Sequence, residues 1–370
     1  MRVLHFYKTA LPDTMGGVEK VIDQIARGAT KLGVKTDVLS LTQKRLPHKI
    51  ENNGYLAHRA RLDFQIASTG FSMSVFLRFA QLVKKADLIH YHFPWPFMDV
   101  VHFATIVKKP TLVTYHSDII RQKYLLKIYR PLQWKFLGDM GHIVATSPNY
   151  LATSDVLTKY KHKVSVIPIG LDKATYPVPL PDKLTYWREK VGQKFFLFIG
   201  AIRYYKGLHI LIEAAQGTDY PIVIVGVGPI EKKLKKQAAQ LGLSNIHFFG
   251  FLHDEDKVAL LTLCYGVLFP SHLRSEAFGI SLLEGAMFGK PMISSEIGTG
   301  TTFINIGHKT GLVVPPSDPL AMRQAMKYLW EHPEQAADMG RRAEARYWGH
   351  FTGDQMVDKY VKLYHKLAGR

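Results

Sequence analysis

The sequence predicts an α/β protein made of two doubly wound parallel sheets. Apolar runs typical of buried strands alternate with amphipathic helical patterns over most of the chain. The alternation lapses once, at the proline-rich stretch 176–181 (YPVPLP), and then begins a second cycle. The 370 residues, 47% of them hydrophobic, suffice for two domains with a core each. We therefore expect domains at residues 1–178 and 179–345, followed by a C-terminal segment at 346–370.

The first domain is expected to open with a buried strand at residues 2–7 and a helix that begins at Gly16-Gly17. Apolar residues recur along that helix at the spacing of one helical turn, and Gly33 follows its end as a C′ glycine does. Further strands are expected at residues 36–41, 88–91, 111–115, 143–146 and 164–167.

The second domain is expected to open with a strand at residues 194–200 (KFFLFIG) and a helix from Gly207. Its later strands are expected at residues 222–225, 246–248, 267–269 and 292–294. The stretch 354–367 places apolar residues on one helical face, without indicating which domain that face covers.

The formal net charge is +18, and it is concentrated in the first half. Residues 1–180 hold 25 Lys and Arg against 12 Asp and Glu, whereas the remainder holds 23 against 18. Such a field suggests an anionic surface or substrate, so nucleic acid, acidic lipids and phosphorylated small molecules are all candidates. The single cysteine, Cys264, excludes an internal disulfide and fits a reducing compartment. With no signal-peptide pattern and no uncharged apolar run of ~18 residues, we expect a soluble or peripheral protein.

Two carboxylates stand out in residues 271–291 (SHLRSEAFGISLLEGAMFGKP), which read as a loop and a helix after a buried strand. A helix N-terminus here would point the N–H groups of Phe278, Gly279 and Ile280 at an anion. Glu276, in the loop, can accept hydrogen bonds from sugar hydroxyls, and Glu284, inside the helix, can reach a ribose. The alternative is that Glu276 caps the helix and Glu284 is an exposed residue of its solvent face.

A second motif is GAIRYYKG at residues 200–207, in the loop that leaves the second domain's first strand. Arg203 and Lys206 can hold a diphosphate there, Arg by its fork and Lys as a point charge. They can also stabilise charge on a leaving group. The alternative is two exposed basic residues in a basic protein.

Glycines and a histidine supply weaker signals in the first domain. Gly16-Gly17 lets backbone approach a ligand at a helix N-terminus, although a plain turn is the alternative and a dinucleotide fingerprint is absent. His116 ends a buried strand, where it can donate to a sugar hydroxyl or act as an acid or base. The alternative for His116 is a structural histidine.

In the second domain, VGVGP at 225–229 contains Gly226 after a strand, and Phe251 follows another strand. Neither signal is specific by itself.

No metal is expected. His90, His92 and His102 fit no zinc-ligand spacing and have no cysteine to assist, so we interpret them as structural. Asp254 and Asp256 form a D-x-D sequence, but they precede a helix, where Asp serves as cap and first-turn residue.

Two basic amphipathic stretches, at residues 72–85 and 119–137, combine apolar faces with cations. The apolar positions are Met73, Phe76, Leu77, Ala80 and Val83 in the first, and Leu125, Ile128, Leu132 and Phe136 in the second. The cations are Arg78, Lys84 and Lys85, then Arg121, Lys123, Lys127, Arg130 and Lys135. Each can bind a membrane surface or simply face a core.

The pattern Glu276…Glu284 within EAFGISLLE resembles the E-x7-E signature of family GT4, retaining glycosyltransferases of the GT-B class. Gly16-Gly17 and Arg203…Lys206 fall in the order that the family has them. The chain departs from the pattern where Ser117 separates His116 from Asp118, and at residues 298–301 (GTGT), where the family often has two glycines.

This resemblance implies two Rossmann-like domains with the active site in the cleft between them, and a terminal helix that crosses back to the first domain. Arg203 and Lys206, with the amides around Gly279, would hold the diphosphate of a nucleotide sugar, which Gly16-Gly17 would face. Glu276 would hold the sugar hydroxyls, Glu284 the ribose, and His116 would lie against the sugar. Gly226 and the main chain at Phe251 would lie near the nucleoside.

The implied reaction moves a hexose to an acceptor hydroxyl with retention, without metal or cofactor. Likeness to bacterial O-antigen mannosyl- and rhamnosyl-type transferases favours GDP-mannose or a related GDP-sugar, with a UDP-hexose as the alternative. The acceptor would be a polyprenyl-diphosphate-linked glycan, at the cytoplasmic face of the inner membrane. Two other classes stay open, namely a GT-B phosphorylase or epimerase and a non-catalytic nucleic-acid-binding protein. The ordered motifs argue against nucleic acid as partner.

Overall fold

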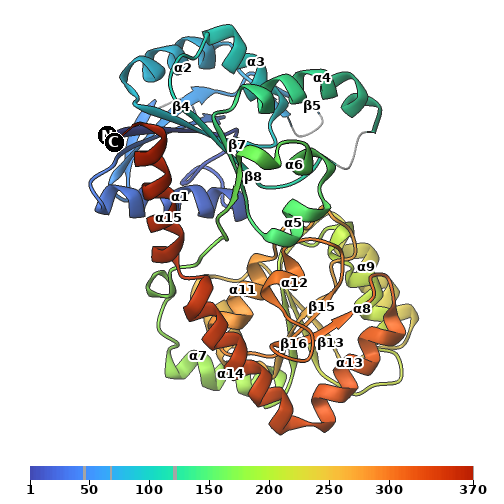
Figure 1. Ribbon diagram of the computed structural model, residues 1–370. Coiled ribbons are helices and arrows are strands. Elements are labelled where there is room, and N and C mark those ends of the chain that lie inside the picture. The colour runs from blue at the N-terminus through green and yellow to red at the C-terminus, as the bar shows by residue number, and fades with distance from the viewer. Residues whose placement is uncertain (45–46, 67–68, 120–122, 370) are drawn as a thin grey trace. The chain divides into compact units, whose positions relative to one another are not determined.

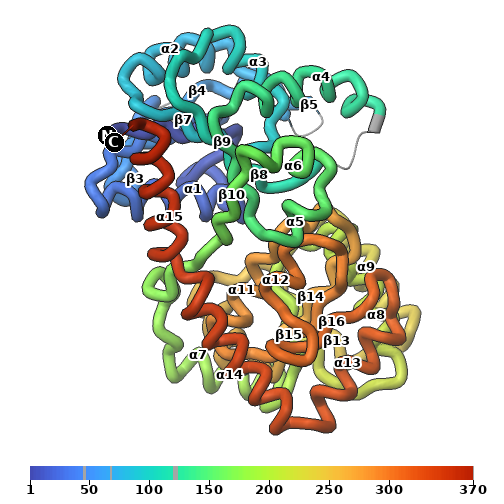
Figure 2. The backbone as a smooth tube through the Cα atoms, viewed as in Figure 1, coloured from blue at the N-terminus to red at the C-terminus, as the bar shows by residue number. Residues whose placement is uncertain are grey.

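The computed structural model describes residues 1–44, 47–66, 69–119 and 123–369. The chain folds into two compact units, shown as ribbon and tube in Figures 1 and 2. Unit 1 comprises Met1–Gly170 together with Gly353–Arg370, and unit 2 comprises Leu171–Thr352.

Unit 1 is built on a sheet with the strand order β10-β9-β8-β7-β1-β2-β4-β3. Neighbouring strands pair in parallel up to β4, and the edge pair β3–β4 is antiparallel. The strands are β1 (Arg2–Phe6), β2 (Lys35–Thr42), β3 (Lys49–Asn52), β4 (Tyr55–Arg61), β7 (Leu88–Phe93), β8 (Thr111–Tyr115), β9 (His142–Ala145) and β10 (Val164–Val166). A separate hairpin joins β5 (Phe64–Ile66) and β6 (Thr69–Phe71).

The helices of unit 1 form two groups. Helix α1 (Gly17–Lys31) lies beside the C-terminal helix α15 (Gly353–Leu367). Helices α2 (Ser74–Lys85), α3 (Pro96–Thr105) and α4 (Lys123–Asp139) pack in a row, each against the next (Figure 1). Shorter helices are α5 (Pro148–Thr153), α6 (Asp155–Lys159) and the 3₁₀ turn Lys161–Lys163.

Unit 2 contains a parallel sheet with the order β13-β12-β11-β14-β15-β16. Its strands are β11 (Phe196–Ile199), β12 (Ile222–Val225), β13 (Ile246–Gly250), β14 (Gly266–Phe269), β15 (Met292–Ser295) and β16 (Gly311–Val314). Strands β11, β12 and β14 are apolar and almost wholly buried, as expected for parallel strands covered on both faces.

The helices of unit 2 cover this sheet. They are α7 (Pro181–Val191), α8 (Leu208–Ala214), α9 (Glu231–Gln240), α10 (Asp254–Leu263), α11 (Ile280–Met287), α12 (Thr301–Ile304), α13 (Pro319–Glu331) and α14 (Pro333–His350). Two 3₁₀ turns lie at Lys173–Thr175 and Tyr204–Lys206. A core cluster that includes Phe196, Leu211, Ile224 and Met326 joins β11, α8, β12 and α13.

The units divide at different residues from those expected. The proline-rich stretch and residues 171–175 before it belong to unit 2. Two contacts tie this segment there, since Tyr347 donates to Leu171 O (2.8 Å) and Tyr176 donates to Glu284 (2.9 Å). The expected boundary after residue 345 falls inside α14, which continues to His350. Only α15, of the expected segment 346–370, lies in unit 1.

Candidate active site

The sheet of unit 2 reverses its direction of growth between β11 and β14. In such sheets ligands bind outside the carboxyl ends of the strands at the point of reversal, where the two loops diverge. The loop after β11 carries Arg203 and Lys206, and the loop after β14 carries Glu276. Two of the motifs predicted from the sequence therefore meet at the switch point of the sheet.

Lys206 and Glu276 form a buried ion pair there. The Lys206 ammonium donates to the Glu276 carboxylate, and the two residues are only 8% and 9% exposed. Ser271 Oγ donates to the same carboxylate oxygen (3.3 Å), and the ammonium lies 4.8 Å from the centre of the Phe269 ring. Burial alone would lower the pKa of Lys206, but the Glu276 carboxylate raises it above its ordinary value. The Lys206 ammonium is therefore charged at neutral pH.

Two glycines allow the loops around this pair to pack backbone against backbone. A Cβ at Gly207 (φ +70°) would lie 1.9 Å from Pro270 O, and one at Gly226 (φ +138°) would lie 1.9 Å from Gly200 O. Both positions also have left-handed φ values, which favour glycine. Gly226 thus has a packing role, because it lets the loop after β12 approach the loop that carries Lys206.

Helix α11 begins beside the ion pair. Gly279 is its N-cap, with φ +103°, and Ile280 is its first residue. A Cβ at Gly279 would lie 3.3 Å from the Phe269 ring, the same ring that Lys206 contacts. Phe278 is buried beneath this turn, against Gly300. The N–H groups of Ile280 and Ser281 precede the first helical hydrogen bonds, which run from Leu282 and Leu283 to Gly279 O. The helix therefore offers its positive end close to Lys206.

Glu284 lies inside α11 and is buried, at 9% exposure. Its Oε1 accepts a hydrogen bond from Tyr176 OH (2.9 Å). Burial, and then the Glu284 carboxylate, raise the pKa of Tyr176, so its hydroxyl stays protonated as the donor. The structure excludes both alternatives for the two glutamates. Glu284 is not an exposed residue, and the N-cap of α11 is Gly279 rather than Glu276.

Arg203 and Phe251 lie at the same edge of the sheet but are not part of the ion pair. Arg203 is exposed and forms no ion pair within the described residues. Phe251 follows β13 and is 65% exposed, and the exposed Val227 lies next to Gly250. An exposed cation and an exposed apolar surface therefore lie at the same edge of the sheet as the buried ion pair.

In unit 1, Gly16 and Gly17 begin α1 as predicted. Gly16 is the N-cap in an extended conformation (φ −148°), and a Cβ there would lie 2.5 Å from Glu19 Oε2. Thr9 donates to the other carboxylate oxygen of Glu19 (2.8 Å). Glycine at position 16 therefore leaves room for a carboxylate held in the first turn.

His116 follows β8 and is buried. Its Nε2 lies 3.0 Å from His92 Nδ1, and burial lowers the pKa of His116 to about 3. At neutral pH the ring is therefore uncharged, which suits a hydrogen-bonding role better than that of a general acid. Sequence reasoning did not find His5, whose Nδ1 lies 3.0 Å from His92 Nε2.

Known proteins resemble this chain over nearly its whole length. The model of Glycosyltransferase Family 4 matches residues 15–175, and that of Glycosyl transferases group 1 matches residues 185–346. The D-rhamnosyltransferase WbpZ of Pseudomonas aeruginosa is 61% identical over 352 residues, which cover 95% of this chain and 92% of the relative. The O-antigen chain mannosyltransferase C of Escherichia coli is 49% identical over 367 residues, 99% of each chain. The chain belongs to glycosyltransferase family 4.

Solved structures show the GT-B fold of this family. Sucrose-phosphate synthase from Thermosynechococcus elongatus matches with a TM-score of 0.83 at 20% identity, over 100% of this chain and 99% of that one. Anabaena HepE in complex with UDP and glucose matches with a TM-score of 0.80 at 17% identity, over 99% and 100%. The predicted family and fold class are confirmed.

Both carboxylates of the D-x-D sequence in this glycosyltransferase contact side chains of the protein itself. Asp254 pairs with Lys257, and Asp256 accepts from Lys183 Nζ (2.8 Å) and Trp187 Nε1 (3.0 Å). Burial opposes ionisation, but the bond from Lys183 lowers the pKa of Asp256. Both lie in the first turn of α10 as predicted, although the N-cap is His253.

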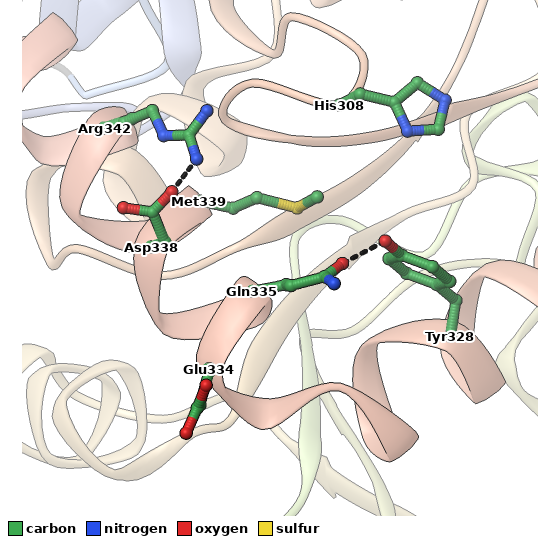
Figure 3. Close-up of a pocket in the computed structure, with 7 residues that line it drawn as sticks. All are labelled: His308, Tyr328, Glu334, Gln335, Asp338, Met339 and Arg342. Atoms are coloured by element: carbon green, nitrogen blue, oxygen red, sulfur yellow. Dashed lines mark hydrogen bonds and ion pairs between the residues drawn. The ribbon is translucent and has the colours of Figure 1, made fainter.

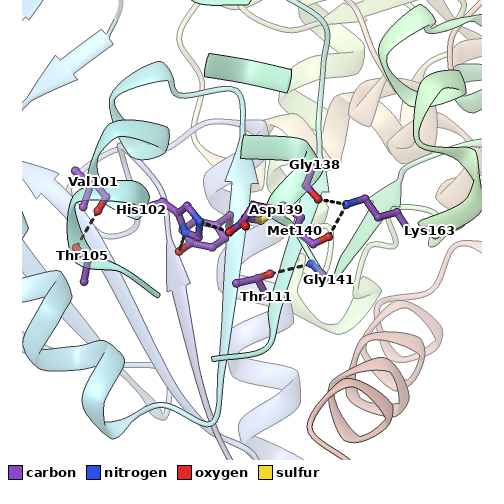
Figure 4. Close-up of polar contacts among 10 residues, drawn as sticks. Val101, His102, Thr105, Thr111, Gly138, Asp139, Met140, Gly141 and Lys163 are labelled. Atoms are coloured by element: carbon purple, nitrogen blue, oxygen red, sulfur yellow. Dashed lines mark hydrogen bonds and ion pairs between the residues drawn. The ribbon is translucent and has the colours of Figure 1, made fainter. Parts of the chain in front are cut away.

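His102 has a hydrogen-bonding partner at each ring nitrogen in unit 1. Its Nδ1 lies 2.7 Å from Tyr91 OH and its Nε2 lies 2.8 Å from Asp139 Oδ2 (Figure 4). Nearby, Lys163 donates to Gly138 O (2.6 Å) and Met140 O (2.7 Å) at the end of α4. These contacts give His102 a structural role, as the sequence predicts.

Unit 2 also has a depression beside α13 and α14 (Figure 3). In it, Tyr328 donates to Gln335 and Arg342 pairs with Asp338. The other lining residues are His308, Glu334 and Met339. Since no predicted site residue lines this depression, we assign it no part in the active site.

The row α2–α3–α4 of the glycosyltransferase exposes large apolar side chains. Those exposed are Met73, Leu77, Val100, Ile106, Tyr124, Leu125, Ile128 and Trp134. The predicted apolar faces thus only partly enter the core, because α2 buries Val75, Phe79 and Val83 instead of Met73 and Leu77. Exposed cations of the same helices are Lys84, Lys85, Lys127, Arg130 and Lys135. Arg121 and the side chain of Lys123, predicted to add charge, lie outside the described residues.

Proposed function

We propose that the protein transfers a hexose from a GDP-sugar, GDP-mannose being the first choice, to a polyprenyl-diphosphate-linked glycan in O-antigen synthesis. The observation that carries this proposal is the buried Lys206–Glu276 ion pair at the switch point, beside the N-terminus of α11. The cation and the helix end suit a diphosphate, and the carboxylate suits sugar hydroxyls. The names of the two relatives, a D-rhamnosyltransferase and an O-antigen mannosyltransferase, favour mannose or D-rhamnose.

Each residue has a proposed part in holding the donor. Lys206, the amides of Gly279 and Ile280, and the exposed Arg203 would bind the diphosphate. Glu276 would accept from the sugar, and Glu284, with one oxygen held by Tyr176, would accept from the ribose. The exposed surface of Phe251 and Val227 would carry the base.

Catalysis would rest on positioning and electrostatics. Lys206 and the helix end stabilise the charge that develops on the leaving diphosphate, which accepts the proton of the acceptor hydroxyl. The reaction then needs no metal and keeps the anomeric configuration. Among the described residues, no helix is both long and apolar enough to cross a bilayer. We propose that the exposed apolar and basic side chains of α2–α4 bind the enzyme to the anionic face of the inner membrane.

The test is a transfer assay with purified protein and a synthetic polyprenyl-diphosphate-linked glycan. Donors are GDP-mannose, GDP-D-rhamnose, UDP-glucose and UDP-N-acetylglucosamine, each with and without EDTA. Product from a GDP-sugar, unaffected by EDTA, is expected. If only a UDP-sugar gave product, the donor in the proposal would become a UDP-sugar. If no donor gave product, the proposal would be overturned.

A further inference from the structure

Three buried histidines on neighbouring strands of unit 1 are hydrogen-bonded in series. His5 on β1, His92 on β7 and His116 after β8 are linked by contacts of 3.0 Å, from His5 Nδ1 to His92 Nε2 and from His92 Nδ1 to His116 Nε2. Successive rings are inclined by only 16° and 18°. Each ring therefore uses its neighbour as its hydrogen-bonding partner.

The surroundings of this chain are fixed and nearly free of charge. His90 stacks on His92 with ring centres 4.3 Å apart, and Tyr364 OH (2.8 Å) and Thr114 Oγ1 (2.7 Å) hold its two nitrogens. Among the described residues, the other titratable groups that face the three histidines or His90 are Tyr7, Tyr360 and Asp37. The helix α15 supplies Tyr360 and Tyr364, so the C-terminal segment helps to hold the histidines.

All three rings are uncharged at neutral pH. Burial lowers the pKa of His5 to about 3, against a smaller opposite effect of Asp37, and lowers that of His116 to about 3. Burial also lowers the pKa of His92 well below its ordinary value. Each ring then has one N–H group. The series has two possible arrangements, in which the rings donate either from His5 toward His116 or from His116 toward His5.

The buried end of the series decides between these arrangements. His5 Nε2 is buried and has no partner within the described residues. If His116 donates to His92 and His92 donates to His5, then His5 Nε2 carries a buried N–H without an acceptor. If His5 donates to His92 and His92 donates to His116, then His5 Nε2 has only an unused lone pair. Orphaned buried N–H groups are the rarer defect in proteins. The favoured arrangement places the protons on His5 Nδ1, His92 Nδ1 and His116 Nδ1.

We propose that His5 and His92 are positioning residues that hold His116 in its Nδ1–H tautomer, as a hydrogen-bond donor to a sugar hydroxyl. Within the described residues, His116 Nδ1 has no protein partner that would compete for this role. Second-layer partners of this kind fix ring orientation and tautomer in other sites. The part that concerns the sugar rests on the proposed function, whereas the tautomer does not.

The tautomer is read directly from ¹⁵N–¹H spectra of the full protein labelled at histidine. The wild type is expected to show His116 protonated at Nδ1. His92→Asn keeps an amide N–H that can donate to His116, and His92→Leu removes it, so only His92→Leu should change the His116 signal. The second pair, His5→Asn and His5→Leu, repeats the test one ring further away. His142→Gln, whose ring instead bonds Ser165, is the control.

Kinetics provide the second reading. His92→Leu should lower kcat about 10- to 100-fold, with KM for the donor little changed, and His92→Asn should recover most of the loss. An Nε2–H tautomer of His116 in the wild type would overturn the proposal, as would equal spectra and equal kcat in both His92 variants. Stoichiometric zinc in the purified protein would replace it with a metal site at His5, His90 and His92. Failure of all donors would count against the function alone, since the spectra need no substrate.

Discussion

Lys206 donates a hydrogen bond to Glu276 across the gap between the two loops that diverge at the switch point of unit 2. This contact unites two motifs that are 70 residues apart in the sequence. Because both side chains are buried, each depends on the other to remain charged. Substitutions at either position therefore have two separable effects, one on the reaction and one on the fold.

Glu276→Gln and Glu276→Ala should both lower the transfer rate by about 100-fold or more, because neither provides a carboxylate for the sugar and the Lys206 ammonium. Their stabilities should differ. Glu276→Ala leaves a buried ammonium unpaired, at a cost of about 3–5 kcal/mol in the free energy of unfolding, whereas the Gln oxygen still accepts from Lys206. Transfer rates and urea unfolding measure the two effects. Normal turnover by Glu276→Gln would remove this residue from the site.

Arg203→Ala should weaken GDP binding by roughly 10- to 150-fold without destabilising the protein. The side chain is exposed and forms no ion pair within the described residues, so its loss leaves no buried charge. A charge-assisted bond to a phosphate is worth about 1.5–3 kcal/mol, which sets this expectation. The matched control is Arg188→Ala, an exposed arginine on α7. Equal affinities of the two variants in calorimetric titration would exclude Arg203 from the diphosphate site.

Tyr176→Phe should raise KM for the donor several-fold and lower the free energy of unfolding by about 1–3 kcal/mol. The hydroxyl holds Glu284 Oε1 in a buried place, and phenylalanine fills the same volume without the donor. Tyr186→Phe, at an exposed tyrosine on α7, is the control. If Tyr176→Phe bound GDP and donor as the wild type does, the hydrogen bond would have no part in orienting Glu284.

Much of this fold can be predicted from the sequence, because parallel strands buried on both faces appear as short continuous apolar runs. The runs at β11, β12 and β14 are clear examples. The edge strand β3 (KIEN) and its neighbour β4 (YLAHRAR) were missed because their polar residues hide a strand pattern. The domain boundary was placed too late, because proline signals a linker even where one residue of the stretch, Tyr176, is tied to a core helix.

The residues of the site were easier to predict than their contacts. Loop motifs place Lys206 and Glu276 at the ends of strands, but spacing along the chain contains no information about which side chains touch. His5 was missed because a lone histidine in an apolar strand looks structural. A signal was available, since His90 and His92 share one face of β7 by the two-residue period of a strand. His5, which pairs in register with His90, has a place on the neighbouring strand.

The buried histidines should make unit 1 sensitive to acid. The pKa of His5 and of His116 is about 3 in the folded protein, below the ordinary value of about 6.5. Between these two pH values the unfolded chain binds more protons than the folded chain does. The free energy of unfolding is therefore highest above pH ~6.5 and decreases as pH falls toward 3. The loss is about 1.4 kcal/mol per pH unit for each such histidine. Urea unfolding from pH 7.5 to 5 should give a shallower pH dependence for His5→Leu, and an equal slope would contradict burial of a neutral His5.

Binding to anionic vesicles should depend on the exposed side chains of α4. Tyr124 and Ile128 are 84% and 80% exposed, and Lys127 and Arg130 lie beside them on the same helix. Ile128→Ser should weaken co-sedimentation with phosphatidylglycerol vesicles several-fold without changing thermal stability, since an exposed side chain contributes little to the core. Leu320→Ser, at an exposed leucine of unit 2, is the matched control. Binding should also fall as salt rises, because the cations act over a Debye length of about 10 Å at 0.1 M. If Ile128→Ser and Leu320→Ser bound the vesicles equally, α4 would have no part in docking to the membrane.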